Sequence, residues 1–132
     1  MFEVLDEPVQ PPDSPDALSI ERCEGDVRLA GVSFSYRPEQ TLIENLHLHA
    51  RPGSRVAIVG PTGCGKTTII NLLMRFYDVR EGTIAIDGID TWNITRDSLR
   101  SMYGRVLQET WLTSGTVREN IAYGKPDATE QE

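Results

Sequence analysis

The sequence predicts a mixed α/β domain, and three patterns support this prediction. Hydrophobic residues alternate with polar or small ones over 27–36 and again over 46–50, which indicates two strands. A short apolar run at 55–59 leads into a glycine-rich loop at 60–67, and apolar residues then recur at helical spacing over 67–77. With 132 residues, the chain has room for one such domain.

The first half of the predicted domain contains three strands and one helix. The alternation over 27–36 is irregular near Gly31, which indicates a bulge. The run 55–59 is β-branched at three of its five positions, which is typical of a strand buried on both faces. In the helix over 67–77, the apolar positions expected to face a core are Ile69, Ile70, Leu72, Leu73 and Phe76.

The second half is expected to alternate short strands with short helices. Residues 83–86 predict a strand, and Asp87-Gly88 predicts a tight turn after it. Two short helices are predicted over 95–102 and 116–121, each with a threonine as its N-terminal cap. Residues 106–107 are expected to lie in another short strand.

The net charge of −7 is concentrated at the beginning of the chain. Residues 1–26 hold eight acidic residues and one basic residue, whereas the remaining 106 residues hold 12 of each. No basic stripe is present, so nucleic-acid binding is not expected as the main task. Residues 6–16 contain four prolines and four acidic residues, a composition that favours either a solvated linker or a terminal segment with no role of its own.

Composition also excludes several classes of protein. The longest clean apolar run covers 56–59, far short of the roughly 20 residues that a membrane-spanning helix needs. The opening residues lack the pattern of a secretory signal, so none is expected. Two cysteines, Cys23 and Cys64, suggest neither a disulfide framework nor a zinc site, which favours a reducing, cytosolic setting.

The segment 60–67 matches the phosphate-binding pattern G-x-x-x-x-G-K-[ST] in full. Its glycines allow backbone N–H groups to point at an anion, and the helix that follows adds its positive end. Lys66 is expected to span the outer phosphates of a nucleotide, which makes it a candidate catalytic residue. The Thr67 hydroxyl is suited to Mg²⁺. The candidate nucleotide-binding residues here are Gly60, Pro61, Thr62, Gly63, Cys64, Gly65, Lys66, Thr67 and Thr68.

Taken with its neighbours, this loop makes the chain resemble a known family. The chain is similar to the nucleotide-binding domain of ATP-binding cassette (ABC) transporters, specifically the exporter type that carries a membrane domain fused upstream. The resemblance implies an α/β fold: an incomplete P-loop NTPase core with an antiparallel β-subdomain. The segments that carry it are 2–8, 32–36 (Val-Ser-Phe-Ser-Tyr), 60–67, 77–88, 106–112 (Val-Leu-Gln-Glu-Thr-Trp-Leu) and 114–121.

The resemblance also implies roles for residues outside the loop. Tyr36 would stack on adenine, and Gln108 would contact Mg²⁺ or the attacking water, as a candidate catalytic and metal-binding residue. Trp111 and Leu112 would face the membrane domain. Residues 1–26 would form the linker from a transmembrane domain, and 27–132 would form the N-terminal part of the nucleotide-binding domain, with a second such domain as its head-to-tail partner on the cytoplasmic side of a membrane.

The parent family hydrolyses ATP to drive export, but several motifs of that chemistry are missing from this sequence. It contains no strand ending in Asp-Glu (the Walker B segment), no serine-glycine-glycine-glutamine signature and no histidine in the switch position. Residues 84–87 resemble the Walker B segment, but Gly88 follows Asp87 where a glutamate is required. Residues 112–115 resemble the signature, but they lack its second glycine and its glutamine. The chain is therefore expected to carry the ATP-binding segments without the complete hydrolytic machinery.

Two other functions compete with that of an exporter ATPase. One is a non-catalytic nucleotide-binding or interaction fragment that docks on partners through Trp111 and the acidic leader, residues 1–26. The other is an unrelated small P-loop kinase or GTPase. A GTPase is disfavoured because no Asn-Lys-x-Asp base-reading motif is present.

The missing carboxylate leads to a direct expectation about activity. Because water activation and positioning contribute much of phosphoryl transfer, the isolated chain should bind ATP weakly and hydrolyse essentially none. Phosphate release measured with malachite green should not exceed that of Lys66→Ala. Release clearly above this control would contradict the expectation.

Overall fold

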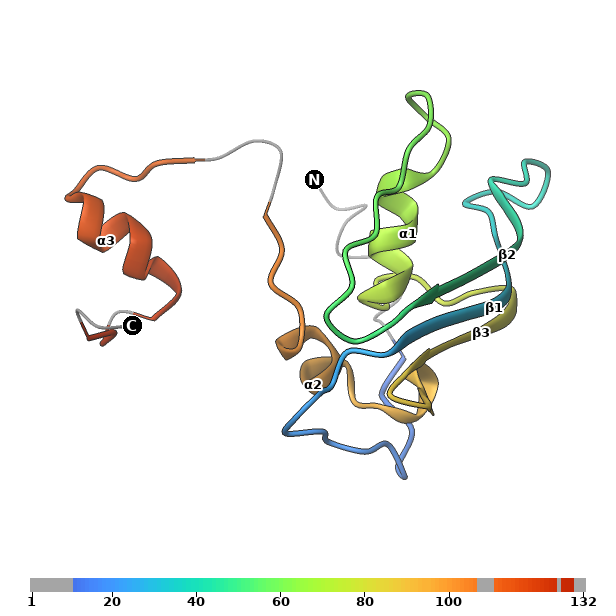
Figure 1. The fold of residues 1–132 in the computed structure, drawn as a ribbon, viewed down its shortest axis with the longest axis horizontal. Coiled ribbons are helices and arrows are strands. Elements are labelled where there is room, and N and C mark those ends of the chain that lie inside the picture. Colours follow the sequence, from blue (N-terminus) through green and yellow to red (C-terminus); the bar gives the residue numbers. More distant parts are fainter. Residues whose placement is uncertain (1–10, 107–110, 126, 130–132) are drawn as a thin grey trace, which may run out of the picture.

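The computed structural model describes residues 11–106, 111–125 and 127–129, which form a small antiparallel sheet with short helices (Figure 1). The helices and strands follow one another as β1 (Val27–Phe34), β2 (Ile43–Ala50), α1 (Lys66–Leu73), β3 (Glu81–Ile86), β4 (Ile89–Asp90), the 3₁₀ helix η1 (Thr91–Asn93), α2 (Arg96–Ser101), α3 (Val117–Ile121) and the 3₁₀ helix η2 (Ala122–Gly124).

The four strands form one antiparallel sheet in the order β2-β1-β3-β4. Val27 at the start of β1 lies opposite Ala50 on β2 and opposite Ile86 on β3, so β1 is the central strand of the three long ones. The strands predicted over 27–36, 46–50 and 83–86 are confirmed, and the expected mixed α/β class holds for the described residues.

The bulge predicted near Gly31 is also confirmed. The register of β1 shifts between Leu29 and Val32 against β2, and Gly31 has a φ of 63°. Gly82 on β3 lies directly against this bulge, and a Cβ atom at Gly82 would lie 2.4 Å from the carbonyl carbon of Gly31. A glycine is therefore required at position 82 for the two strands to approach this closely.

The tight turn predicted at Asp87-Gly88 joins β3 to β4. Both residues have positive φ, 50° and 80°, as a two-residue hairpin turn requires. The Asp87 carboxylate accepts hydrogen bonds from the backbone N–H groups of Glu24 at 2.7 Å and Asp26 at 2.8 Å. Asp87 therefore fixes the segment that leads into β1. This structural role differs from that of the Walker B aspartate, which the sequence of residues 84–87 resembles.

Helix α1 covers one face of the sheet (Figure 1). Leu72 is buried among residues of β1, β2 and β3, and Ile69 and Leu73 pack at the edge of the same cluster. The buried members from the sheet are Leu29, Val32, Phe34, Ile43 and Ile84. A second cluster, made of Ile86, Ile94 and Leu99, joins β3 to α2. Burial of these side chains is the main driving force available to so small a fold.

The prediction of a strand over 55–59 is wrong. The residues run from β2 to the glycine-rich loop without strand structure, and Val56 and Val59 are 50% and 87% exposed instead of buried. A strand buried on both faces needs a neighbouring strand on at least one edge, and no described segment pairs with 55–59. Likewise, Val106 is exposed outside any strand, and Leu107 lies outside the described residues.

The predicted helices exist, with one shortened. Helix α1 ends at Leu73 and not near 77, because Met74 caps it and Arg75 adopts a left-handed φ of 51°. The Thr95 hydroxyl accepts from the Ser98 N–H at the start of α2. Thr116 and Glu119 form a reciprocal capping box at the start of α3, so both predicted threonine caps are confirmed.

Two arginines are buried where α1, α2 and the leader meet. The guanidinium of Arg75, which is 4% exposed, contacts Asp78 at 3.0 Å and Asp13 at 3.8 Å. The guanidinium of Arg96 forms an ion pair with Asp13, and the second carboxylate oxygen of Asp13 accepts from the Arg96 backbone N–H at 3.0 Å. A buried charge is costly unless it is paired, so two arginines and two aspartates compensate each other here.

Beyond Asp13, the described part of the leader continues along η1 and α2. Leu18 exchanges two backbone hydrogen bonds with this region, to Asn93 and Thr95, and forms an isolated parallel bridge to Ile94. The Ser98 hydroxyl donates to the Ile20 carbonyl at 3.0 Å and accepts from the Ile20 N–H at 2.7 Å. The division of the chain at residue 26 into linker and domain stays a prediction.

The environment of Asp13 predicts an acid-sensitive contribution to stability. The Arg96 backbone N–H and then the guanidinium groups of Arg96 and Arg75 hold the pKa of Asp13 below its ordinary value. The stabilisation is therefore complete above about pH 4 and is lost as the pH falls through the lower pKa of the folded state. Asp13→Asn should lower the unfolding free energy by about 2 kcal/mol at pH 7, and by progressively less as the pH falls below 4.

Urea unfolding at several pH values measures this effect. Asp16→Asn is the matched control, because Asp16 is an exposed acidic residue three positions further along the same segment. An equal loss in both variants, or a loss in Asp13→Asn that is independent of pH, would contradict the assignment.

Candidate nucleotide-binding site

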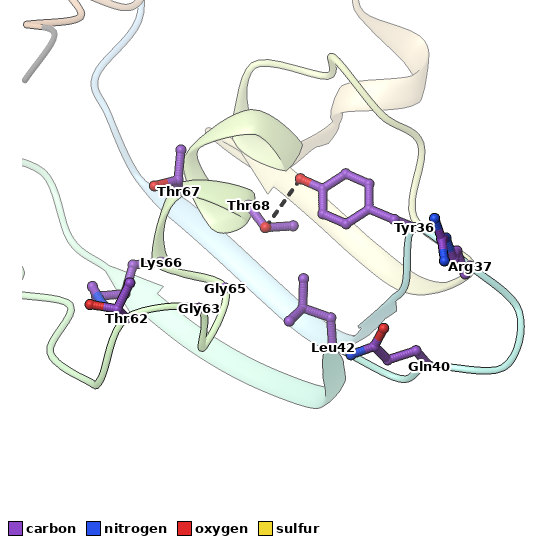
Figure 2. A pocket seen from close by; sticks show the side chains of 10 residues that line it. All are labelled: Tyr36, Arg37, Gln40, Leu42, Thr62, Gly63, Gly65, Lys66, Thr67 and Thr68. Atoms are coloured by element: carbon purple, nitrogen blue, oxygen red, sulfur yellow. Dashed lines mark hydrogen bonds between the residues drawn. The ribbon is translucent and has the colours of Figure 1, made fainter. Parts of the chain in front are cut away.

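A cavity of about 620 Å³ lies between the end of β1 and the start of α1 (Figure 2). One side is formed by the connection from β1 to β2 and the other by the glycine-rich loop and the first turn of α1. Its lining residues are Tyr36, Arg37, Gln40, Leu42, Thr62, Gly63, Gly65, Lys66, Thr67 and Thr68.

The loop reaches the helix through a left-handed residue. Gly65 is the N-cap of α1 with a φ of 93°, and a Cβ at this position would lie 3.4 Å from Leu42. Glycine is the residue that adopts this conformation without strain. The first turn of α1 therefore begins at the cavity wall, and the unpaired N–H groups of a helix N-terminus favour an anion there.

Lys66 lies in the loop and lines the cavity. Its Nζ donates hydrogen bonds to the carbonyl oxygens of Gly60 at 2.8 Å and Pro61 at 2.7 Å, and it lies 3.8 Å from the Cys64 Sγ. The ammonium group thus links both ends of the loop. Lys66 is half-buried and lines the same cavity as the N-terminus of the helix.

The two threonines after Lys66 lie in different environments. Thr67 is exposed at the cavity, and its hydroxyl forms no hydrogen bond with the described residues, whereas Thr68 is 5% exposed. The Thr68 hydroxyl shares a hydrogen bond with the Tyr36 hydroxyl at 3.1 Å, drawn as a dashed line in Figure 2. This contact joins the end of β1 to the first turn of α1.

Tyr36 stands beside the phosphate loop, as the sequence predicts for an adenine-stacking residue. The ring is 52% exposed and lines the cavity. It packs perpendicular to the rings of Phe34 and Tyr77, with centroids 5.0 and 5.1 Å away. A half-exposed aromatic ring at a cavity of this size is a suitable surface for a nucleobase.

The structure brings most of the predicted site residues together. Six residues of the segment 60–68 line the cavity, and the other three contact it indirectly, because Gly60, Pro61 and Cys64 are the partners of Lys66. Gln108 lies outside the described residues. The described residues contain no group of three or more His, Cys, Asp or Glu side chains placed to hold a metal ion.

Sequence reasoning missed the residues on the opposite wall. Arg37 and Gln40 line the cavity from a turn closed by a hydrogen bond from the Gln40 N–H to the Arg37 carbonyl at 3.2 Å. The signal was available, because Pro38 in the second position is typical of such a turn. Tyr77 begins the segment 77–88 that contributes to the resemblance, and nothing in its spacing indicates that its ring meets Tyr36.

Comparison with known proteins is in agreement with this geometry. A family model described as ABC transporter matches residues 43–132, more than half of the chain. The chain belongs to the ABC transporter family. The resemblance predicted from the sequence is thereby confirmed, and ATP binding is the property that this family shares.

Curated relatives place the chain within the exporter type of ABC transporter. It is 53% identical over its whole length to the fatty acid ABC transporter ATP-binding/permease protein of Mycobacterium bovis, of which it covers 21%. It is 42% identical over its whole length to the ATP-dependent lipid A-core flippase of Desulfotalea psychrophila, of which it covers 23%. The chain therefore spans about a fifth of the length of these relatives and is part of an ABC exporter ATP-binding domain.

A solved structure shows the same fold. The structure of a bacterial Atm1-family ABC exporter with ATP bound matches 98% of this chain with a TM-score of 0.85 and 40% identity, and the chain covers 23% of that protein. In the part of the chain that is described, no helix combines the length and the apolar character needed to cross a membrane.

Proposed function

We propose that this chain binds ATP together with Mg²⁺ in the cavity between Tyr36 and the phosphate loop, as the nucleotide-binding part of an exporter. The observation that carries the proposal is the shared cavity: one wall offers a half-exposed aromatic ring, and the other offers the lysine and the N-terminus of α1. These walls suit the two ends of a nucleotide, a flat base and a chain of anions.

The phosphate end is assigned to the loop. Lys66 would exchange its contacts with the Gly60 and Pro61 carbonyls for oxygens of the outer phosphates, and charge-assisted hydrogen bonds would strengthen that exchange. The Thr68 hydroxyl, which lies beside Tyr36, would bind the inner phosphate. The positive end of α1 would oppose the negative charge of the phosphates.

A magnesium ion fits the donor set on this side of the cavity. Mg²⁺ keeps several waters and is usually held by one or two protein oxygens together with nucleotide phosphates. The exposed hydroxyl of Thr67 offers such an oxygen. Gln108 is proposed as the second ligand on the resemblance alone. When bound, the ion would neutralise charge on the phosphates.

In the whole exporter, this domain would work at the cytoplasmic side of a membrane. Relatives named ATP-binding/permease proteins combine both functions in one chain. We therefore assign the region 106–112, with Trp111 and Leu112, to contact with a transmembrane domain, and we expect a second nucleotide-binding domain as a head-to-tail partner. ATP hydrolysis by the complete pair would drive export, with Lys66 and Gln108 as this chain's contribution.

A second candidate is a non-catalytic fragment that docks on a partner. It is favoured by apolar side chains that stand exposed near α3, which lies apart from the sheet in Figure 1. Trp111 and Leu112 are each 85% exposed. Capture of an intact exporter by this chain, abolished in Trp111→Ser, would support docking, and failure to associate would leave only the nucleotide-binding function.

The nucleotide site predicts a specific loss of affinity. Lys66→Ala should weaken ATP binding about tenfold or more, because a charged donor to the phosphates is removed. Titration of a fluorescent ATP analogue measures the affinity, and competition by ATP and by GTP tests the preference for adenosine.

The sequence offers a matched control for this variant. Lys125 is the only other lysine of the chain, and it is exposed outside the cavity, so Lys125→Ala makes the same change of charge elsewhere. Equal losses in the two variants would show that only net charge matters, which would contradict the proposed site.

A further inference from the structure

We propose that Tyr77 is a positioning residue for nucleotide binding: it holds the ring of Tyr36 in the orientation that receives the base. The proposal rests on the proposed function of Tyr36. It adds a residue that follows the phosphate-loop helix and that neither the loop motif nor the resemblance marks as part of the site.

Three aromatic rings form one cluster beside the cavity. The centroids of Tyr36 and Tyr77 are 5.1 Å apart with their planes at 87°, and those of Tyr36 and Phe34 are 5.0 Å apart, also at 87°. The ring centroids of Phe34 and Tyr77 are 5.7 Å apart, with the two planes tilted at 53°. Perpendicular pairs at these distances are favourable beyond the area that they bury. Each ring of the cluster therefore restrains the other two.

The ring of Tyr36 is fixed by contacts of two kinds. Phe34 and Tyr77 pack against the ring itself, and Thr68 holds the hydroxyl at its tip by the 3.1 Å hydrogen bond. About half of the surface of Tyr36 remains exposed at the cavity that it lines. The side chain is thus oriented before any base arrives, with a surface still open to receive it.

Tyr77 is itself held in place by its neighbours in the sequence. Arg75 and Asp78 form an ion pair at 3.0 Å on either side of it. The Phe76 N–H donates to the Asn71 carbonyl at 2.9 Å, and the guanidinium of Arg100 lies 4.8 Å from the centre of the Phe76 ring. The backbone around Tyr77 is therefore anchored to the end of α1 and to α2.

Tyr77 acts on the site through Tyr36 and not by its own contact with the nucleotide. Its side chain is absent from the lining of the 620 Å³ cavity and belongs to a separate cavity of about 200 Å³ shared with Trp92 and Ile84. Without Tyr77, the ring of Tyr36 would gain rotational freedom that ATP binding must then remove. Ordering a side chain on binding reduces affinity.

The experiment compares two probes, ATP and inorganic tripolyphosphate, by calorimetric titration of the 132-residue chain. Tyr77→Ala should weaken ATP binding about three- to tenfold and leave tripolyphosphate binding unchanged, since only the base uses Tyr36. Tyr77→Phe keeps the ring and should restore ATP affinity. Tyr123→Ala removes a tyrosine that is 76% exposed and outside the cluster, so it serves as the matched control.

The double variant separates positioning from direct contact. Once Tyr36 is replaced by alanine, Tyr77→Ala should cause no further loss of ATP affinity, because its effect passes through the missing ring. An additive loss would overturn the proposal, and so would ATP affinity that is unchanged in Tyr77→Ala. If Tyr77→Ala also loses tripolyphosphate binding through misfolding, Tyr77→Leu, which keeps apolar bulk without a ring, decides between the same outcomes.

The roles of Tyr36 and Tyr77 can be tested separately. If Tyr36→Ala leaves ATP affinity unchanged, the assignment of Tyr36 in the proposed function is wrong. If Tyr36→Ala weakens ATP binding and Tyr77→Ala does not, the proposed function stands and only the positioning role of Tyr77 is lost.

Discussion

The packing of α1 against the sheet is the contact on which the rest of this structure depends. Leu72, 1% exposed, lies among the buried residues of three strands, and this fixes both ends of a helix of eight residues. The N-terminal end carries the phosphate loop with Lys66. The C-terminal end leads directly to Arg75 in the ionic cluster and to Tyr77 beside Tyr36. A single hydrophobic contact therefore positions the loop, the aromatic ring and the charged junction with the leader.

Local patterns predicted the local structure of the chain well. Alternation predicted β1 and β2, the Asp87-Gly88 pair predicted the turn after β3, and threonine caps predicted the starts of α2 and α3. The failures came where structure depends on distant partners. The run 55–59 has the composition of a buried strand, but composition does not supply a neighbouring strand. The pairing of Asp13 with Arg96 joins residues 83 positions apart, and no short-range pattern encodes it.

In the candidate site, too, the residues that are contiguous in sequence could be predicted and those brought together by the fold could not. The loop 60–67 could be recognised because its chemistry is contiguous, and the comparisons agree with the family that it suggested. Tyr36 was found through the resemblance, since an aromatic residue just after a strand does not by itself indicate a binding site. The residues around it, Arg37, Gln40 and Tyr77, come from two separate turns. Their convergence follows from the fold of β1 and α1 and could not be inferred from spacing.

The two carbonyl contacts of Lys66 have a consequence for how readily the loop accepts an anion. They act as an internal cross-link that sets the curvature of the loop from within its own sequence. In the proposed function, phosphate binding would exchange these two carbonyl acceptors of Lys66 for phosphate oxygens. Because the loop is already closed on Lys66 before any ligand is present, the entropic cost of ordering it for an anion would be met during folding.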